Sequence, residues 1–250
     1  PHHISPTRSH PISHLYPTCI SPLSPLLALT RPSLTSPGVS AQECSHAAGA
    51  LWSLSVNSPD TRVIVCRHKA VFAIWVGMMK AARQSSTAMA AAGQAAGALG
   101  ETCIAHPDNK RTAVNAGAIH ALLPLVEQRG SSSVQTKAVI ALCNVVANDD
   151  TARIVAAQLH LVQKIVPLVA SKSLAGKCLA AVLALISNTL PTQASLQCVA
   201  GVKPQLKTLA KEKGKDKRGK AAKGVEEQWN VGTHAARVLQ WLKQPPTDPR

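Results

Sequence analysis

Apolar residues recur at helical spacing from residue 43 onward, and the pattern returns along the chain at a fixed interval. The segment AAGAL at 47–51 returns unchanged at 95–99, which is 48 residues later. The Ala-Leu pair that ends this segment returns at 141–142 and again at 184–185, at intervals of 43 residues. Self-similarity at this period predicts structural repeats, with these segments forming equivalent long helices.

A second apolar segment repeats with the same interval between the long helices. The run AGAIHALLPLVE at 116–127 matches AQLHLVQKIVPLVAS at 157–171, and Pro124 and Pro167 are 43 residues apart. AGVKPQLKTLA at 200–210 is a weaker third copy. Because both segments keep one period, each repeat is expected to contain a middle helix as well as a long one.

Short polar segments separate the two kinds of helix. They are NSPDTR (57–62), HPDNKR (106–111) and NDDTAR (148–153). Each contains a carboxylate that could accept backbone N–H groups at the start of a further short helix. We expect these N-caps to be Asp60, Asp108 and either Asp149 or Asp150.

A unit of short, middle and long helices cannot bury its apolar side alone, so neighbouring units must stack. The predicted fold is all-α, a right-handed α–α superhelix of about four repeats plus partial end units. The array is expected to cover residues 43–210 and to resume in a C-terminal helix or helices at 226–244, where THAARVLQWLKQ carries one apolar face. A Lys-rich insertion at 211–225 interrupts the last repeat, and tails are expected at 1–42 and 245–250.

The segment at 98–149 resembles the armadillo repeat. In that family a polar turn precedes an A-G-A-I motif, and the long third helix ends in A-L-x-N-L. Here Asn109, Ala116 to Ile119, and Ala141 to Val145 fit this pattern. The resemblance covers about residues 43–210 and implies an armadillo-type solenoid, which agrees with the repeat analysis.

The first full copy departs from the family pattern. The run VIVCRHKAVFAIWVGMMKAARQ at 63–84 lacks the A-G-A-I turn, and its interval of 48 residues predicts a longer loop or helix. It carries the large side chains Phe72, Trp75, Met78 and Met79. We expect these to fill the core or an end of the array, and a peptide-contacting stripe is the alternative.

Composition agrees with helix stacking and indicates the compartment. Aromatic residues make up 2% of the chain while apolar residues reach 46%, so Ala, Leu and Val must build the core. The seven cysteines stand singly without a CxxC pair, and most lie among apolar residues. This favours free thiols in a reducing compartment, and we expect a cytoplasmic or nuclear protein without a membrane span.

Residues 1–40 hold eight Pro, eight Ser and no acid, which indicates a disordered tail or a transit peptide.

Charge is concentrated in one segment. The chain has a formal net charge of +15, and nine basic residues but two acids fall between Lys203 and Lys223. The basic patch within the insertion comprises Lys211, Lys213, Lys215, Lys217, Arg218, Lys220 and Lys223. A solvated loop, a nuclear localisation or acidic-partner signal, and nucleic-acid binding are the three interpretations.

Catalytic and cofactor motifs are missing from the sequence. It contains no GxxxxGK[ST], GxGxxG, HExxH or GxSxG. Cys66 and His68 are close in sequence, but residues two apart on a helix point to different sides. We therefore expect a non-enzyme with no catalytic residues, no metal site and no cofactor.

The armadillo resemblance implies that the long helices line a concave groove, where an Asn near the helix end hydrogen-bonds an extended peptide. Asn144 matches that Asn, and stepping by the repeat interval gives the remaining candidates. They are Ser53, Glu101, Ser187 with Asn188 as its neighbour, and Trp241. Solvated helix faces are the alternative for these residues. The import adaptors of the family place a Trp one turn before each Asn. This array is absent here, because the residue four positions before Asn144 is Ile140 and not Trp.

The sequence thus predicts a non-catalytic scaffold that binds an extended or helical segment of a protein partner along the groove. The alternative is a nuclear or nucleic-acid-associated module that uses the basic segment 203–223. We expect a monomer, or part of a longer repeat chain. Joint substitution of Asn144 and Glu101 is expected to weaken groove binding without unfolding the chain.

Overall fold

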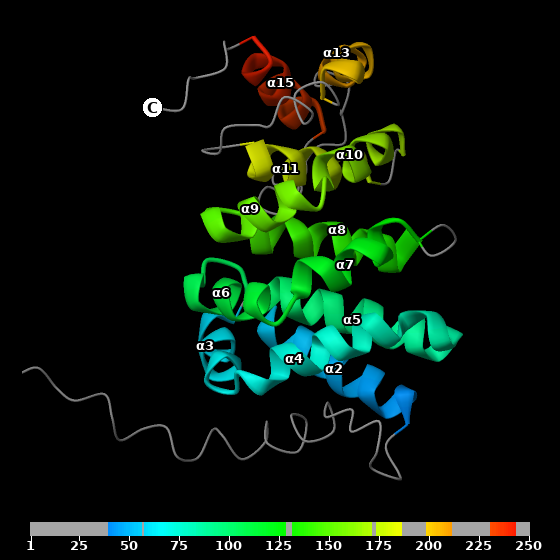
Figure 1. Cartoon of the computed structure of the whole chain (residues 1–250), viewed down its shortest axis with the longest axis vertical. Helices are drawn as coiled ribbons and strands as arrows, with labels where there is room; N and C mark the ends of the chain where they lie inside the picture. Colours follow the sequence, from blue (N-terminus) through cyan, green and yellow to red (C-terminus); the bar gives the residue numbers. More distant parts are fainter. Residues whose placement is uncertain are drawn as a thin grey trace, which may run out of the picture.

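The computed structural model describes residues 40–56, 58–128, 132–171, 174–186, 199–211 and 231–243. In this part of the chain all regular elements are helices (Figure 1). In chain order they are α2 (Ala41–Ser55), α3 (Pro59–Arg67), α4 (Ala70–Lys80), η2 (Ala81–Gln84), α5 (Ser86–Thr102), α6 (Pro107–Asn115), α7 (Ala118–Val126), α8 (Ser132–Val146), α9 (Asp150–Gln158), α10 (Leu161–Ile165), η3 (Val166–Ala170), α11 (Ala175–Ile186), α13 (Lys203–Lys211) and α15 (Val231–Trp241).

The helices form repeats of three. A short first helix (α3, α6, α9) leads into a second (α4–η2, α7, α10–η3) and then into a third (α5, α8, α11), while α2 and α15 occupy third-helix positions at the two ends. Successive third helices pack against one another in the order α2, α5, α8, α11 and α15 (Figure 1). The predicted all-α solenoid is confirmed.

The observed helix ends refine the predicted boundaries. Helix α2 begins at Ala41, two residues before the predicted start, because Ser40 and Glu43 form a capping box. At the other end α13 ends at Lys211 and α15 lies inside the predicted 226–244 segment. The predicted tails before residue 40 and after residue 243, and the insertion from residue 212, lie outside the described residues.

The predicted N-caps are right in one of three repeats. Asp149 caps α9, and its Oδ1 accepts the Ala152 N–H at 2.7 Å. In α3 and α6, however, a proline occupies the first helical turn, so the cap falls on the residue before it. These caps are Ser58 and His106. Asp60 and Asp108 lie inside the first turn, where their negative charges interact favourably with the positive end of the helix dipole.

The backbone of the turns repeats more faithfully than the sequence. Gly117, before α7, has φ +86°, and His160, 43 residues later before α10, is also left-handed at +52°. Ala105 and Asn148, again 43 residues apart, both have left-handed φ values, +52° and +57°, between a third helix and the next first helix. The stack therefore imposes a left-handed turn even where the residue is not glycine.

The five additional residues of the first repeat lengthen its second helix. Together α4 and η2 cover residues 70–84, whereas α7 has nine residues. Phe72 and Trp75 are fully buried with an edge-on ring contact at 5.6 Å, and Met78 and Met79 are buried beside them. The core interpretation of these four residues is confirmed.

Small residues allow the third helices to approach closely. The buried face of α5 is built largely from alanine, and at Gly100 an added Cβ would lie 2.7 Å from the Cα of Ala141 on α8. Cysteine thiols belong to the same apolar interior, where Cys178 is buried and Cys143 is partly buried. Burial raises the pKa of Cys143 to about 11 and that of Cys178 to about 12, so both are neutral thiols.

Candidate functional site

The predicted groove residues that the structure describes all lie on third helices. Ser53 is on α2, Glu101 on α5, Asn144 on α8 and Trp241 on α15. Ser187 and Asn188 lie outside the described residues. Sequence reasoning thus assigned the right class of helix to these positions, and the hydrogen bonds show what the side chains do in the isolated chain.

Asn144 joins two third helices. Its Nδ2 donates to the Gly100 carbonyl of α5 at 3.1 Å, and the residue is 9% exposed. The amide therefore already bonds a backbone carbonyl, but this carbonyl belongs to the neighbouring helix of the same chain. Whether Asn144 also contacts a partner stays a prediction.

Glu101, next to the residue that Asn144 contacts, is held in an ion pair. Its Oε1 lies 2.5 Å from Nη2 of Arg62, with side-chain exposures of 16% and 12%. Arg62 also donates from Nε to the Ser55 carbonyl at the end of α2. The pair links the first helix α3 to two third helices, so Glu101 has a structural role. Joint substitution of Asn144 and Glu101 is therefore expected to loosen the stack, contrary to the prediction from sequence.

The other two candidates make different contacts. The Ser53 hydroxyl is exposed and donates to the Gly49 carbonyl within its own helix at 3.0 Å. Trp241 is half-buried and packs against the core at the far end of the array. Contact of either residue with a partner is untested by the geometry.

Three half-buried side chains from consecutive third helices meet on the surface of the array. Nζ of Lys137 on α8 lies 4.7 Å from the ring centroid of Trp52 on α2 and donates to Oε1 of Gln94 on α5 at 3.2 Å. An added Cβ at Gly97 would lie 2.9 Å from the Trp52 ring, so the indole rests on the backbone of α5. We call the surface carrying Trp52, Gln94 and Lys137 the long-helix face.

Sequence reasoning missed this cluster, although part of its signal was present. Gln94 and Lys137 are 43 residues apart, which is the repeat interval, and both are polar positions on apolar helices. Trp52 is not related to Gln94 or Lys137 by the repeat interval, because its ring extends across the backbone of α5 to reach Lys137. Burial lowers the pKa of the Lys137 ammonium, as expected for a cation partly covered by neighbouring helices.

Cations on the first helices form a second structural series that sequence reasoning missed. Arg62, Lys110 and Arg153 are separated by the repeat intervals and are largely buried. Arg153 Nε donates to the Ala184 carbonyl on α11 at 3.0 Å, and Lys110 Nζ donates to the Ala147 carbonyl after α8. These side chains neutralise the negative ends of third helices, so they are positions that hold the array together.

The basic patch is described only at its first residue. Lys211 ends α13 and is exposed, in line with Lys203 and Lys207 at successive turns, whereas the patch residues from Lys213 to Lys223 lie outside the described part. The sequence holds no carboxylate from residue 151 to residue 211, so the charged side chains of this stretch are all basic. Charge alone does not choose between an acidic protein and nucleic acid.

The described residues hold no cluster of three His, Cys, Asp or Glu side chains that could bind a metal. The Cys66 side chain lies outside the described set, so its pairing with His68 is untested.

No single described helix has the length and hydropathy to cross a membrane. Among the described helices, only the pair formed by α9 and α10–η3 has the required length and hydropathy when its two parts are counted together, and the pair is bent by 72°.

Stacked three-helix repeats of this kind define an α-solenoid. No protein-family model and no curated protein matches the sequence. Solved structures do match. A designed armadillo repeat protein in complex with a (KR)4 peptide aligns at a TM-score of 0.64 and 18% identity, covering 89% of this chain and 82% of that one.

Two natural proteins align as well. The armadillo-repeats-only protein of Plasmodium falciparum gives a TM-score of 0.61 at 14% identity, covering 89% of this chain and 93% of that one. A chain from a study of the phosphorylation switch between cadherin and beta-catenin gives 0.59 at 14% identity, covering 92% of this chain and 43% of that one. The chain therefore has an armadillo-type repeat fold, as the sequence resemblance implied.

Proposed function

We propose that this chain is a non-catalytic, protein-binding scaffold, and that a segment of a partner protein lies across the long-helix face. The observation that carries the proposal is the contact among Trp52, Gln94 and Lys137, which brings an aromatic ring, an amide and a cation from three helices together on one surface. Aromatic and amide side chains are well suited to an extended peptide, because they combine apolar contact with backbone hydrogen bonds.

The solved structures support the proposal at the level of the fold. One of the matching armadillo proteins was solved with a peptide, and another comes from work on the cadherin interaction of beta-catenin. The ligand of this chain is expected to differ from a (KR)4 peptide. Lys137 adds a positive charge to the long-helix face, and the carboxylate of Glu101, on the same helix as Gln94, is paired with Arg62. Like charges across an interface disfavour binding, so we expect a neutral or acidic segment.

Peptide display against the full chain tests the proposal. Peptides selected from a random library are measured by fluorescence anisotropy with the wild type, with Lys137→Glu and with Lys207→Glu. The last variant makes the same charge change on α13, which lies at the opposite end of the stack from α2 and α5 (Figure 1). We expect Lys137→Glu to weaken binding at least about tenfold and Lys207→Glu to leave it within about twofold. Equal affinity of every enriched peptide for all three proteins contradicts the proposal.

The alternative, nucleic-acid association through the basic segment, is favoured by one observation. Lys203, Lys207 and Lys211 form an exposed stripe on α13, in a stretch of sequence without carboxylates. Filter binding of the full chain and of a 211–224 deletion to duplex and single-stranded DNA and RNA tests it. Binding that falls steeply with salt and disappears on deletion supports this alternative. Affinity that stays flat between low and high salt removes it.

A further inference from the structure

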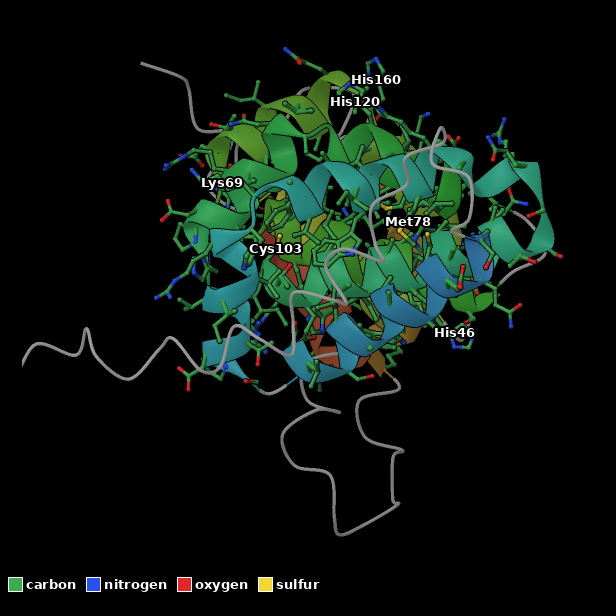
Figure 2. All side chains as sticks on the ribbon, turned by 90° about the horizontal axis from the view of Figure 1, so that it is seen from below. His46, Lys69, Met78, Cys103, His120 and His160 are labelled. Atoms are coloured by element: carbon green, nitrogen blue, oxygen red, sulfur yellow. The ribbon has the colours of Figure 1, made fainter. Side chains whose placement is uncertain are left out.

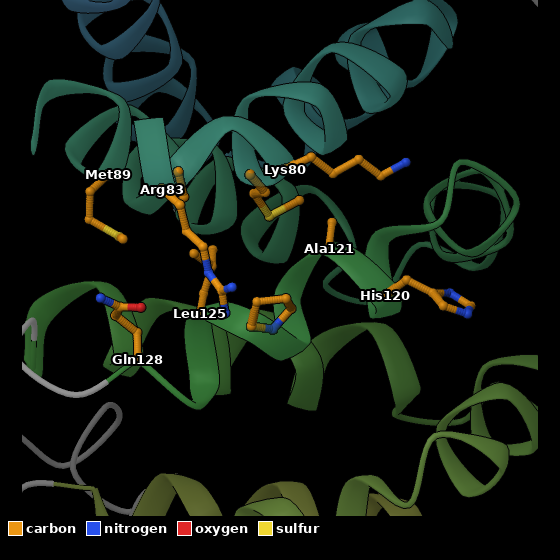
Figure 3. Close-up of a pocket in the computed structure, with 10 residues that line it drawn as sticks. Lys80, Arg83, Met89, His120, Ala121, Leu125 and Gln128 are labelled. Carbon is orange, nitrogen blue, oxygen red and sulfur yellow. The ribbon is translucent and has the colours of Figure 1, made fainter. Parts of the chain in front are cut away.

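A pocket of about 240 Å³ opens between the second helices of the first two repeats (Figure 3). Its apolar lining includes Met79, Ala82, Ala121 and Leu125, which are each at most 3% exposed. Part of its lining comes from η2, which carries Ala82 and Arg83 and continues the second helix of the first repeat.

This pocket lies on a different side of the stack from the long-helix face. In the view along the stack, His120, which lines the pocket, falls on the same side as His160, whereas His46 of the third helix α2 falls on a different side (Figure 2). It is therefore separate from the surface of the proposed function.

The polar residues at the pocket are positive or neutral. Arg83 extends from η2 toward α7 across the mouth, while Lys80 and His120 project outward from the other rim (Figure 3). No Asp or Glu is among the lining residues. The ion pairs in the described part of the chain do not include Arg83. Glu127, the carboxylate that directly follows α7, is paired with Lys164 at 2.8 Å. Arg83 thus remains available to an external anion.

The size and chemistry of the pocket indicate the occupant. It is smaller than the roughly 300–1,000 Å³ of drug-sized ligand sites, and it suits one or two large apolar side chains. Its lining holds no Phe, Tyr or Trp, and the imidazole of His120 projects outward, so the pocket itself offers no ring on which a nucleobase could stack (Figure 3). An exposed guanidinium over an apolar floor matches a protein segment with an apolar side chain next to a carboxylate.

We propose that this pocket is a second docking site, which takes an acidic amphipathic segment of a protein partner. A Leu, Met or Phe side chain of the partner occupies the pocket and packs on its apolar floor, which is formed by Met79, Ala82, Ala121 and Leu125. Neighbouring Asp or Glu side chains of the partner pair with Arg83 and are attracted by the positive charge of Lys80. The site is independent of the long-helix face, and either can fail without the other.

The test uses two displayed peptide libraries and the full chain. In one library Leu, Met or Phe is flanked by Asp and Glu, and in the other by Lys and Arg. Enriched peptides are measured by fluorescence anisotropy with the wild type, Arg83→Glu, Arg83→Ala and the charge-matched control Lys207→Glu. Ala121→Leu, which fills the pocket without changing charge, is measured in parallel, and circular dichroism confirms that each variant is folded.

We expect only the acidic library to be enriched. Arg83→Glu and Ala121→Leu should each weaken binding at least about tenfold, Arg83→Ala should act in the same direction, and Lys207→Glu should stay within about twofold. Lys137→Glu should leave this binding unchanged, which separates the site from the proposed function. Equal loss in Arg83→Glu and Lys207→Glu, equal enrichment of both libraries, or Arg83-dependent binding of anionic vesicles or nucleic acid without peptide enrichment overturns the proposal.

Discussion

Replacing Gly100 by alanine tests how closely the third helices are packed. The new Cβ would lie 2.7 Å from the Cα and 2.9 Å from the Cβ of Ala141. Both atoms are fixed to the backbone of α8, so no rotamer change can relieve the overlap, and the two helices must separate. Separation also stretches the 3.1 Å hydrogen bond from Asn144 to the Gly100 carbonyl.

The magnitude follows from three terms. A helical Gly→Ala change gains about 1 kcal/mol of propensity. Overpacking costs about 1–3 kcal/mol, with the upper part expected against backbone atoms. Loss of the Asn144 hydrogen bond costs about 1 kcal/mol. The net expectation is a destabilisation of about 1–3 kcal/mol, which lowers Tm by about 2–4 °C per kcal/mol in a chain of this size.

Gly49→Ala is the matched control. At that position on α2 the nearest atom to the new Cβ is Gln94 Cδ at 3.6 Å, an ordinary contact, so only the propensity gain of about 0.5–1 kcal/mol remains. Urea unfolding followed by far-UV circular dichroism measures both variants. Opposite signs support the close approach of α5 and α8, and a Gly100→Ala variant as stable as Gly49→Ala refutes it.

Three further predictions follow from the turns, the ion pair and the buried thiols. Ala105→Gly should stabilise the chain by about 0.5–1 kcal/mol in thermal unfolding, because the left-handed φ of +52° strains alanine, and a loss of stability contradicts this interpretation. Glu101→Gln should cost about 1.5–3 kcal/mol because it breaks the largely buried pair with Arg62, and a double-mutant cycle with Arg62→Met that shows no coupling argues against the pair. Cys143 and Cys178, with pKa values raised to about 11 and 12, should resist iodoacetamide in the native state at about pH 8. Peptide mass mapping measures the labelling, and prompt labelling of the native chain contradicts the raised pKa values. Since their folded pKa values exceed the ordinary thiol value, their contribution to stability is full below about pH 9 and is lost as the pH rises above it, so stability that rises across this window counts against the assignment.

The repeat period alone was enough to predict the solenoid and its third helices. Apolar spacing determines which side of a helix is buried, and the 43-residue interval relates equivalent helices. The same reasoning explains why the large side chains around Trp75 were correctly assigned to the core.

The roles of individual polar residues could not be predicted in this way. Asn144 and Glu101 were expected to face a peptide, and this contact stays a prediction. Each also bonds a neighbouring helix, which the period could not show because it does not specify how far a helix is rotated about its axis. The Trp52–Lys137 contact spans two helix spacings, so no single offset in the sequence identifies it. The pocket is lined in part by η2, the extension of one second helix, which the interval of 48 residues showed only as extra length.

Site-specific photo-crosslinking tests the central claim most directly. A photoreactive phenylalanine derivative replaces Gln94 on the long-helix face, or Ile154, which is 56% exposed on the first helix α9 and serves as the control. The full chain is then irradiated with a peptide selected by display. Efficient crosslinking from position 94 and little from position 154 is the result that the account predicts. Crosslinking from position 154 but not from position 94 would place the partner elsewhere and contradict the account.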